Sequence, residues 1–323
     1  MNILITGGAG YIGSVLVRQM IQKGYNVRVL DKLSFGGEPI VDLLNDNKFE
    51  FQLGDVTNAS DVKNAVSGMD AVVHLASIVG DPACAKEPEL ARNTNIDGSF
   101  LLYQEAYKAG VTRFVFASTC SNYGKMDDPE SFVTEDSTLS PVSLYAETKV
   151  EVENFLLNQR RDTNISPTCL RFSTVYGLSP RVRFDLTVNE FTRELSLGRE
   201  LVIFGEQFWR PYCHVVDLAR SAIAVIEAPK EAVNFEVLNV GDTSENYTKK
   251  MIVEEISNQI PNTKISYVQK DEDPRDYRVS FQKIKERIGF EITKKVPDGI
   301  SQIIYSLKSG FFKNPDDRKF SNI

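Results

Sequence analysis

Histidine and cysteine are scarce in this chain, and both scarcities narrow the kinds of site that it can carry. The 323 residues include two histidines, His74 and His214, so we expect no metal site built from several histidine ligands. The four cysteines lie far apart and form no CxxC motif. Such spacing is typical of reduced thiols and predicts a cytoplasmic protein.

An excess of basic residues is also missing, as is any long apolar run. With 37 basic and 44 acidic side chains the net charge is −7, which argues against a nucleic-acid partner, because phosphate binding requires a basic face. No run of about 18 apolar residues is present, so we expect no membrane association. The apolar run Ile3-Leu4-Ile5 follows residue 1 almost directly, without a basic segment or cleavage site, so we expect no secretory leader.

Short apolar runs alternate with helical patterns from Asn2 to Arg171. Strands are predicted at residues 2–6, 27–30, 49–53, 71–75, 113–117 and 166–171. Helices are predicted between them at residues 12–23, 59–67, 87–109 and 144–160. This alternation is typical of βαβ units, and it predicts an α/β fold with a doubly wound parallel sheet of the Rossmann type.

The pattern changes after Arg171, which indicates a second, smaller and partly interleaved domain. We place the first domain at residues 1–170 with a return near 212–240, and the second at residues 171–211 and 241–323. Helices are expected near 184–197, 215–227, 248–259, 280–287 and 296–308, and strands at 201–204 and 235–238. The polar tail, residues 313–323, is expected to be loosely held.

A glycine-rich turn separates the first predicted strand from the first helix. Gly7 permits a tight turn, Gly10 lets the backbone approach a pyrophosphate, and Gly13 lets helix and strand pack closely. Asp31 ends the next strand, where a carboxylate binds ribose hydroxyls and repels a 2′-phosphate. The context predicts dinucleotide binding, with NAD favoured over NADP, although Lys32 can offset that preference. A purely structural turn is the alternative.

Further cofactor contacts are expected around this loop and where later strands end. These residues are Tyr11, Ile12, Asp55, Val56, Leu75, Ala76, Ser77, Asn95 and Ser118. His74 also ends a strand, but we interpret it as a hydrogen-bonded structural residue rather than a catalytic base.

Tyr145 and Lys149 lie four residues apart in a predicted helix, so both side chains share one face. An ammonium group lowers the pKa of a nearby phenol, and a phenolate can take a hydroxyl proton as hydride leaves carbon. Thr119 follows the fifth strand and can hydrogen-bond the reacting oxygen. Tyr145, Lys149 and Thr119 are therefore the predicted catalytic residues, with Tyr145 and Lys149 also contacting the cofactor.

Taken together, these motifs resemble the extended short-chain dehydrogenase/reductase family, and within it the NAD-dependent nucleotide-sugar epimerases and dehydratases. The motifs are Gly7–Gly13, Asp31, Gly54-Asp55, His74-Leu75-Ala76, Thr119, Tyr123-Gly124 and Tyr145-x-x-x-Lys149. The resemblance implies a nucleotide-diphosphate sugar as substrate. It also implies a homodimer formed through the helices at 87–109 and 144–160.

The resemblance continues in the second half and supplies the candidates for substrate binding. Segments 170–177 and 210–217 and the late loop 273–277 match the family's sugar-nucleotide site. Arginine binds phosphate bidentately, so the arginines of these segments are diphosphate candidates. The substrate-binding candidates are Thr174, Arg181, Arg183, Arg210 and Arg275, and Arg171 is a further possible diphosphate ligand.

The residues after Thr119 separate the reactions known in this family. In 4,6-dehydratases a glutamate occupies the position of Ser121, and in 3,5-epimerases a cysteine does, so Ser121 fits neither reaction. Cys120 stands one residue earlier, where a small buried thiol is favoured over a catalytic role. We keep both Cys120 and Ser121 as possible catalytic residues.

Hydride transfer without an additional base fits this sequence best, so a sugar 4-epimerase is the favoured function. A nucleotide-sugar 4-dehydrogenase is the main alternative, because segment 175–186 and the late loop resemble dehydrogenases of nucleotide-linked heptoses such as a GDP-heptose. Thr174 stands where 4-epimerases usually carry asparagine, which argues against an ordinary UDP-galactose or UDP-glucose substrate. A 4,6-dehydratase, an NADPH-dependent ketoreductase and a non-catalytic dinucleotide-binding protein are less favoured.

Overall fold

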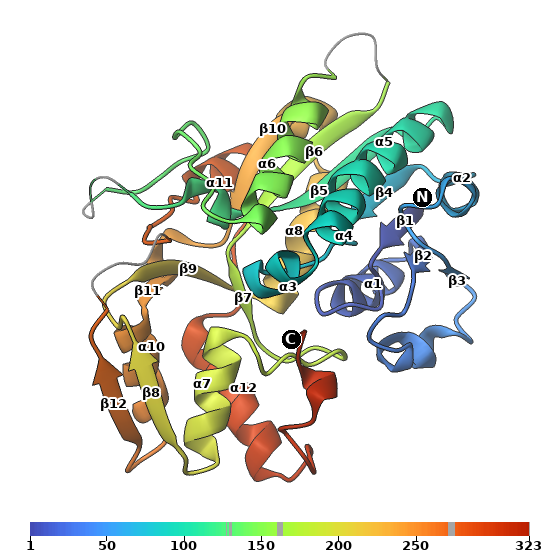
Figure 1. Ribbon diagram of the computed structural model, residues 1–323. Helices are drawn as coiled ribbons and strands as arrows, with labels where there is room; N and C mark the ends of the chain where they lie inside the picture. Colours follow the sequence, from blue (N-terminus) through green and yellow to red (C-terminus); the bar gives the residue numbers. More distant parts are fainter. Residues whose placement is uncertain (127, 129–130, 160–163, 271–274, 323) are drawn as a thin grey trace.

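The computed structural model describes residues 1–126, 128, 131–159, 164–270 and 275–322, and a parallel sheet dominates it (Figure 1). Within these residues the sheet has seven strands in the order β10-β6-β5-β4-β1-β2-β3. The strands are β1 (Asn2–Thr6), β2 (Asn26–Asp31), β3 (Phe49–Leu53), β4 (Ala71–His74), β5 (Arg113–Thr119), β6 (Ser166–Phe172) and β10 (Glu236–Val240). The predicted α/β fold of the Rossmann type is confirmed.

The strands form because their short apolar runs can be covered on both faces. Ile3, Leu4 and Ile5 of β1 are fully buried, and β1 pairs with β2 on one side and β4 on the other. Ile3 and Ile5 belong to one apolar core, whereas Leu4 belongs to the core on the opposite face. Strand order reverses at β1, and ligands of such sheets bind at the carboxyl edge beside this switch point.

Helices cover both faces of this sheet (Figure 1). One face carries α1 (Gly13–Gln22) and α8 (Val215–Glu227), which pack against each other, and the other carries α2 (Ala59–Val66), α5 (Gly98–Lys108) and α6 (Leu144–Leu157). The shorter helices are α3 (Asp81–Lys86), α4 (Pro88–Arg92), α9 (Lys230–Val233) and α11 (Gln282–Ile288). The predicted helix at 87–109 is interrupted, since a π-helical turn at Asn93–Asp97 joins α4 to α5. In the part of the chain described here, no helix combines the length and the apolar character that a membrane span requires.

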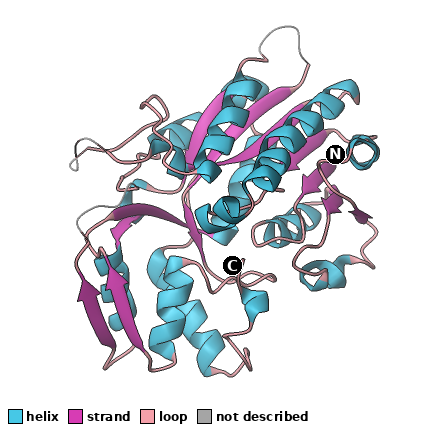
Figure 2. Cartoon of the chain, viewed as in Figure 1, coloured by secondary structure: helices cyan, strands magenta, loops and turns pink. Residues whose placement is uncertain are grey.

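The remaining elements gather below the large sheet in the view of Figure 2. Strand β9 (Trp209–His214) lies between β7 (Thr174–Tyr176), which is parallel to it, and β11 (Asn246–Thr248), which is antiparallel. Strands β8 (Glu200–Phe204) and β12 (Lys264–Val268) form a parallel pair. Helices α7 (Thr187–Ser196), α10 (Lys249–Ser257) and α12 (Val296–Lys308) pack around a separate apolar core. Of these strands, only β8 was predicted, and the predicted domain boundaries remain a prediction.

Candidate active site

A cleft of about 500 Å³ opens where the carboxyl ends of β1 to β5 meet. Most of the predicted cofactor residues line it, including all three glycines of the glycine-rich turn. The others are Tyr11, Ile12, Asp31, Lys32, Asp55, Val56, Leu75, Ala76, Ser77 and Ser118. The structure therefore brings together residues from five separate strand ends.

The glycine-rich turn has no room for a side chain at Gly7 or Gly13. Gly7 has a φ of +75°, and a Cβ atom there would lie 2.8 Å from the backbone nitrogen of Ala76. A Cβ atom on Gly13 would lie 2.2 Å from the carbonyl oxygen of Gly7. Because α1 begins at Gly13, its first N–H groups and its positive dipole end lie directly behind this turn. The turn is thus a fitting cradle for the diphosphate of a dinucleotide.

Asp31 ends β2 at the edge of the cleft and is held in place by backbone. Its carboxylate accepts hydrogen bonds from the N–H groups of Ala9, at 2.9 Å, and Leu33, at 2.8 Å. Partial burial raises the pKa of Asp31, and these backbone hydrogen bonds oppose that shift. Lys32 contacts Asp55 at 3.3 Å, so its charge is directed to that carboxylate. Asp31 therefore stands at the edge of the cleft, where a carboxylate distinguishes a ribose from its 2′-phosphate.

Thr119, Tyr145 and Lys149 line the same cleft. Thr119 is the last residue of β5, and its hydroxyl caps the following 3-10 turn, Cys120–Tyr123, by accepting the N–H of Ser121 at 3.1 Å. Tyr145 and Lys149 lie one turn apart on α6. The Lys149 ammonium donates to the carbonyl of Ala117 at 3.0 Å and lies 5.7 Å from the centre of the Tyr145 ring. Strand β5 and helix α6 therefore place the three side chains at one end of the cleft.

Burial controls the ionisation of this group. It lowers the pKa of Lys149 to about 8 and raises the pKa of Tyr145. Cys84 and Asp81 raise the pKa of Tyr145 further, while Arg183 lowers it. Burial of Tyr145 therefore opposes the expected lowering of its phenol pKa by Lys149.

Neither Cys120 nor Ser121 is among the residues that line the cleft. The Cys120 thiol is 1% exposed and donates to the carbonyl of Arg171 at 3.2 Å, and burial raises its pKa. Ser121 forms a hydrogen bond with the side chain of Tyr277. A neutral, buried thiol is a packing residue rather than an acid or base.

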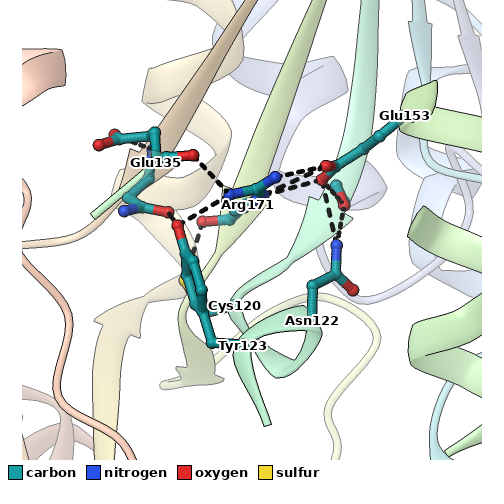
Figure 3. Close-up of polar contacts among 8 residues, drawn as sticks. Cys120, Asn122, Tyr123, Glu135, Glu153 and Arg171 are labelled. Carbon is teal, nitrogen blue, oxygen red and sulfur yellow. Dashed lines mark hydrogen bonds and ion pairs between the residues drawn. The ribbon is translucent and has the colours of Figure 1, made fainter. Parts of the chain in front are cut away.

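A buried polar network includes residues of the turn that follows Thr119 (Figure 3). Arg171, on β6, lies between Glu153 on one side and Tyr123 and Glu135 on the other, and its Nη2 is 2.7 Å from a Glu153 oxygen. Glu153 also accepts hydrogen bonds from Ser118 and Asn122. Arg171 does not line the cleft, and its charge is neutralised by Glu153, so it is not a diphosphate ligand here. Glu153 belongs to none of the sequence motifs, although its position four residues after Lys149 places both on one face of α6.

Two other polar residues near the cleft, His74 and Asn95, are structural. The His74 ring contacts the hydroxyls of Thr6, at 2.7 Å, and Ser99, at 2.8 Å, and burial lowers its pKa to about 3. The neutral imidazole agrees with the predicted structural role. Asn95 is 1% exposed and accepts from the N–H of Ile78 at 2.8 Å. It holds the strand end beside the cleft but does not line the cleft itself.

The candidate substrate residues fall into two groups. Arg181 and Arg183 line the cleft, whereas Thr174, Arg210 and Arg275 do not. Arg183 forms a bidentate ion pair with Asp185, and Arg275 contacts Asp81 at 2.7 Å. The guanidinium of Arg210 lies 5.4 Å from the centre of the Tyr277 ring. Asp273 and Pro274 of the late loop lie outside the described residues.

The dinucleotide cradle, the ribose-reading acid and the Thr-Tyr-Lys group define an NAD-dependent oxidoreductase of the short-chain type. The chain belongs to the NAD dependent epimerase/dehydratase family, whose model matches residues 3–241, and NAD is its cofactor. It is 30% identical to a UDP-glucose 4-epimerase of Lactobacillus helveticus over 79% of this chain and 80% of that protein.

Two solved structures extend the similarity to almost the whole chain. The first is the UDP-glucose 4-epimerase of Thermotoga maritima with UDP-glucose, with a TM-score of 0.84 and 28% identity over 96% of this chain and 100% of that one. The second is the dTDP-glucose 4,6-dehydratase DesIV of Streptomyces venezuelae with NAD bound, with a TM-score of 0.85 and 25% identity over 99% of each chain. The two relatives therefore share the fold of this chain but carry out two different reactions.

Proposed function

We propose that this chain is an NAD-dependent 4-epimerase of a nucleotide-diphosphate sugar. The proposal rests on which residues are present at the reacting end of the cleft. Thr119, Tyr145 and Lys149 line it, but the two residues after Thr119 bring no carboxylate. A 4-epimerase needs no further base, because the hydride removed from C4 returns to the same carbon. A 4,6-dehydratase also needs a base for the proton at C5.

Each catalytic side chain has a role in this reaction. Bound NAD supplies the hydride acceptor for the first step and the hydride donor for the second. Tyr145 takes the proton of the C4 hydroxyl as the C4–H bond breaks, and returns it after the 4-keto sugar has exposed its other face. Lys149 stabilises the phenolate with its charge and holds the nicotinamide ribose, and Thr119 donates a hydrogen bond to the reacting oxygen.

We assign the diphosphate of the sugar nucleotide to Arg210 and Arg275. Arg210 packs over Tyr277, whose side chain reaches Ser121 beside the catalytic turn. Arg275 contacts Asp81, one of the groups that act on the pKa of Tyr145. These contacts support a position of both guanidinium groups near the reacting end of the cleft. Thr174 lies in β7, one residue before Val175, which lines the cleft, and we assign it a contact with the sugar.

Incubation with a panel of UDP-, GDP-, CDP- and dTDP-sugars tests the reaction. Product NMR and NADH absorbance should be followed together. A 4-epimer without net NADH is the expected result. Accumulating NADH with a 4-keto sugar would identify the alternative, a 4-dehydrogenase, and a 4-keto-6-deoxy product would overturn the argument from Ser121.

Tyr145→Phe tests the proposed base. The variant should keep bound NAD and lose at least about a hundredfold in turnover, because the phenylalanine cannot move a proton. Tyr305→Phe is the matched control, since Tyr305 is 76% exposed and is not among the residues that line the cleft. Full activity of Tyr145→Phe would exclude this mechanism, and a loss of NAD from it would indicate a binding role instead.

We also propose that the protein is a cytoplasmic homodimer formed through α5 and α6. Phe100 of α5 and Phe155 of α6 stack with ring centres 4.0 Å apart. The contact holds the two helices side by side, so that together they present one surface. Leu90 and Tyr107 on the same helical stretch remain exposed. Light scattering of the purified protein should give twice the mass of the chain, and a monomer would contradict the proposal.

A further inference from the structure

One arginine of the cleft, Arg181, is buried without an acidic partner among the described residues. Arg181 is 5% exposed, and no carboxylate of a described residue lies within ion-pair distance of it, since the nearby Asp185 pairs with Arg183. Within the described chain its Nε atom also has no hydrogen-bond partner. Burial lowers the pKa of Arg181 to about 10. A buried cation without a nearby anion is unfavourable, so binding of an anion at this position would stabilise it.

The surroundings of Arg181 place it at the cofactor end of the cleft. Its guanidinium lies 4.0 Å from the centre of the Phe35 ring, and both residues line the cleft. Phe35 follows Asp31 by four residues, so it belongs to the segment that reads the ribose. The guanidinium therefore lies beside the segment that reads the ribose.

The C-terminal tail completes this edge of the cleft. The prediction of a loosely held tail is wrong for residues 318–322, because Phe184 donates its N–H to the carbonyl of Phe320 at 2.8 Å. The Phe320 ring also packs against Phe184. Asn322 donates its N–H to Asp185 at 3.2 Å and lines the cleft, where its side-chain oxygen is buried without a partner in the described chain.

Hydrogen bonds fasten this edge to the glycine-rich turn. Ser179 donates its hydroxyl to the carbonyl of Tyr11 at 2.6 Å and accepts the N–H of Arg181 at 3.2 Å. The Tyr11 hydroxyl donates to the carbonyl of Gly177. Arg181 in turn donates to the carbonyl of Ser321 at 3.1 Å. The arginine, the tail and the phosphate cradle are therefore one connected assembly.

We propose that Arg181 and the C-terminal tail form a second wall of the NAD site, in which Arg181 binds a phosphate of the dinucleotide. The Asn322 oxygen accepts a hydrogen bond from a hydroxyl of the same cofactor. Arg181, expected from its sequence position to bind the sugar nucleotide, is thereby assigned to the cofactor. The inference rests on the family's use of NAD and not on the proposed epimerase reaction.

NAD and UDP both carry a diphosphate, so their affinities for the same variants show whether Arg181 contacts the cofactor or the substrate. NAD and UDP should be titrated calorimetrically into the 323-residue protein after removal of bound NAD, using wild type, Arg181→Gln and Arg181→Lys. Arg181→Gln should weaken NAD about ten- to a hundredfold and change UDP affinity less than about threefold. Arg181→Lys should recover part of the loss, because it restores the charge. Weakened UDP with unchanged NAD would assign Arg181 to the substrate and overturn the proposal.

The tail is tested by Asn322→Ala and by a chain that ends after Phe320. Both variants should lose NAD faster than wild type when the purified holoprotein is dialysed, and the shorter chain should lose it fastest. Arg199→Gln is the control, because Arg199 is an exposed arginine paired with Asp316, outside the cleft. Circular dichroism melts confirm that each variant is folded. Wild-type NAD retention by Asn322→Ala and by the shortened chain would overturn the role of the tail.

Discussion

Removal of the Glu153 carboxylate should be among the most destabilising changes available in this chain. Glu153 is 1% exposed and Arg171 is 4% exposed, and Arg171 donates to it through Nε and Nη2 at 2.7 to 3.2 Å. Breaking a buried ion pair by removing one partner costs about 3–5 kcal/mol, because the other charge stays buried without compensation. We expect Glu153→Ala to lower the free energy of unfolding by that amount.

Urea unfolding, followed by the fluorescence of Trp209 and by circular dichroism, measures the effect. Asp316→Ala is the control, because the side chain of Asp316 is 44% exposed and that of its partner Arg199 is 43% exposed. Exposed pairs contribute about 0–1 kcal/mol, so this variant should unfold almost like wild type.

A double variant distinguishes the cost of an unpaired buried charge from the cost of lost side-chain volume. Arg171→Met with Glu153→Leu replaces both charges by apolar groups, and it should be more stable than Glu153→Ala by about 1–3 kcal/mol. A loss below about 1 kcal/mol in Glu153→Ala would refute the reasoning. So would a double variant that is less stable than Glu153→Ala.

Three further predictions concern ionisation and the cofactor cleft. The Lys149 pKa of about 8 means that the folded protein binds fewer protons than the unfolded chain between about pH 8 and 10. The stability of wild type relative to Lys149→Met should therefore rise by about 1–3 kcal/mol across that range in urea unfolding, and a constant difference would contradict the shift. Gly13→Ala should weaken NAD at least about tenfold in calorimetry, since its Cβ meets the Gly7 carbonyl at 2.2 Å, whereas Gly37→Ala should bind normally. Asp31→Ser should raise the affinity for NADP relative to NAD at least about tenfold, and an unchanged ratio would show that Asp31 does not read the ribose.

The large sheet was predictable because each of its first six strands carries a local signal. A short apolar run buried on both faces, such as Ile3-Leu4-Ile5, is visible without knowledge of the partners. Strands β7, β9 and β11 were missed because they are short or irregular. Pro211 lies within β9, where a proline is unusual, and β11 spans only three residues. Their pairing depends on residues distant in the chain.

In the candidate site, too, the local motifs were predictable from the sequence and the contacts between distant residues were not. The glycine turn, Asp31 and the Tyr145/Lys149 pair are fixed by spacing within one or two elements, and the structure brings them into one cleft. The pairing of Arg171 with Glu153 joins β6 to α6, so the sequence does not distinguish Arg171 from a phosphate ligand. Asn322 lies at the opposite end of the sequence from the glycine turn and carries no motif that would connect the two.

The position of β10 has a consequence for synthesis on the ribosome. All of β10 pairs with β6, from Thr168 to Phe172, yet β6 ends at Phe172 and β10 starts only at Glu236. A nascent chain that ends before Glu236 therefore exposes an unpaired, apolar edge of β6. Such an edge is a template for pairing with another chain. Until β10 emerges, aggregation competes with folding, and a chaperone that covers β6 during this interval would raise the yield of the native protein.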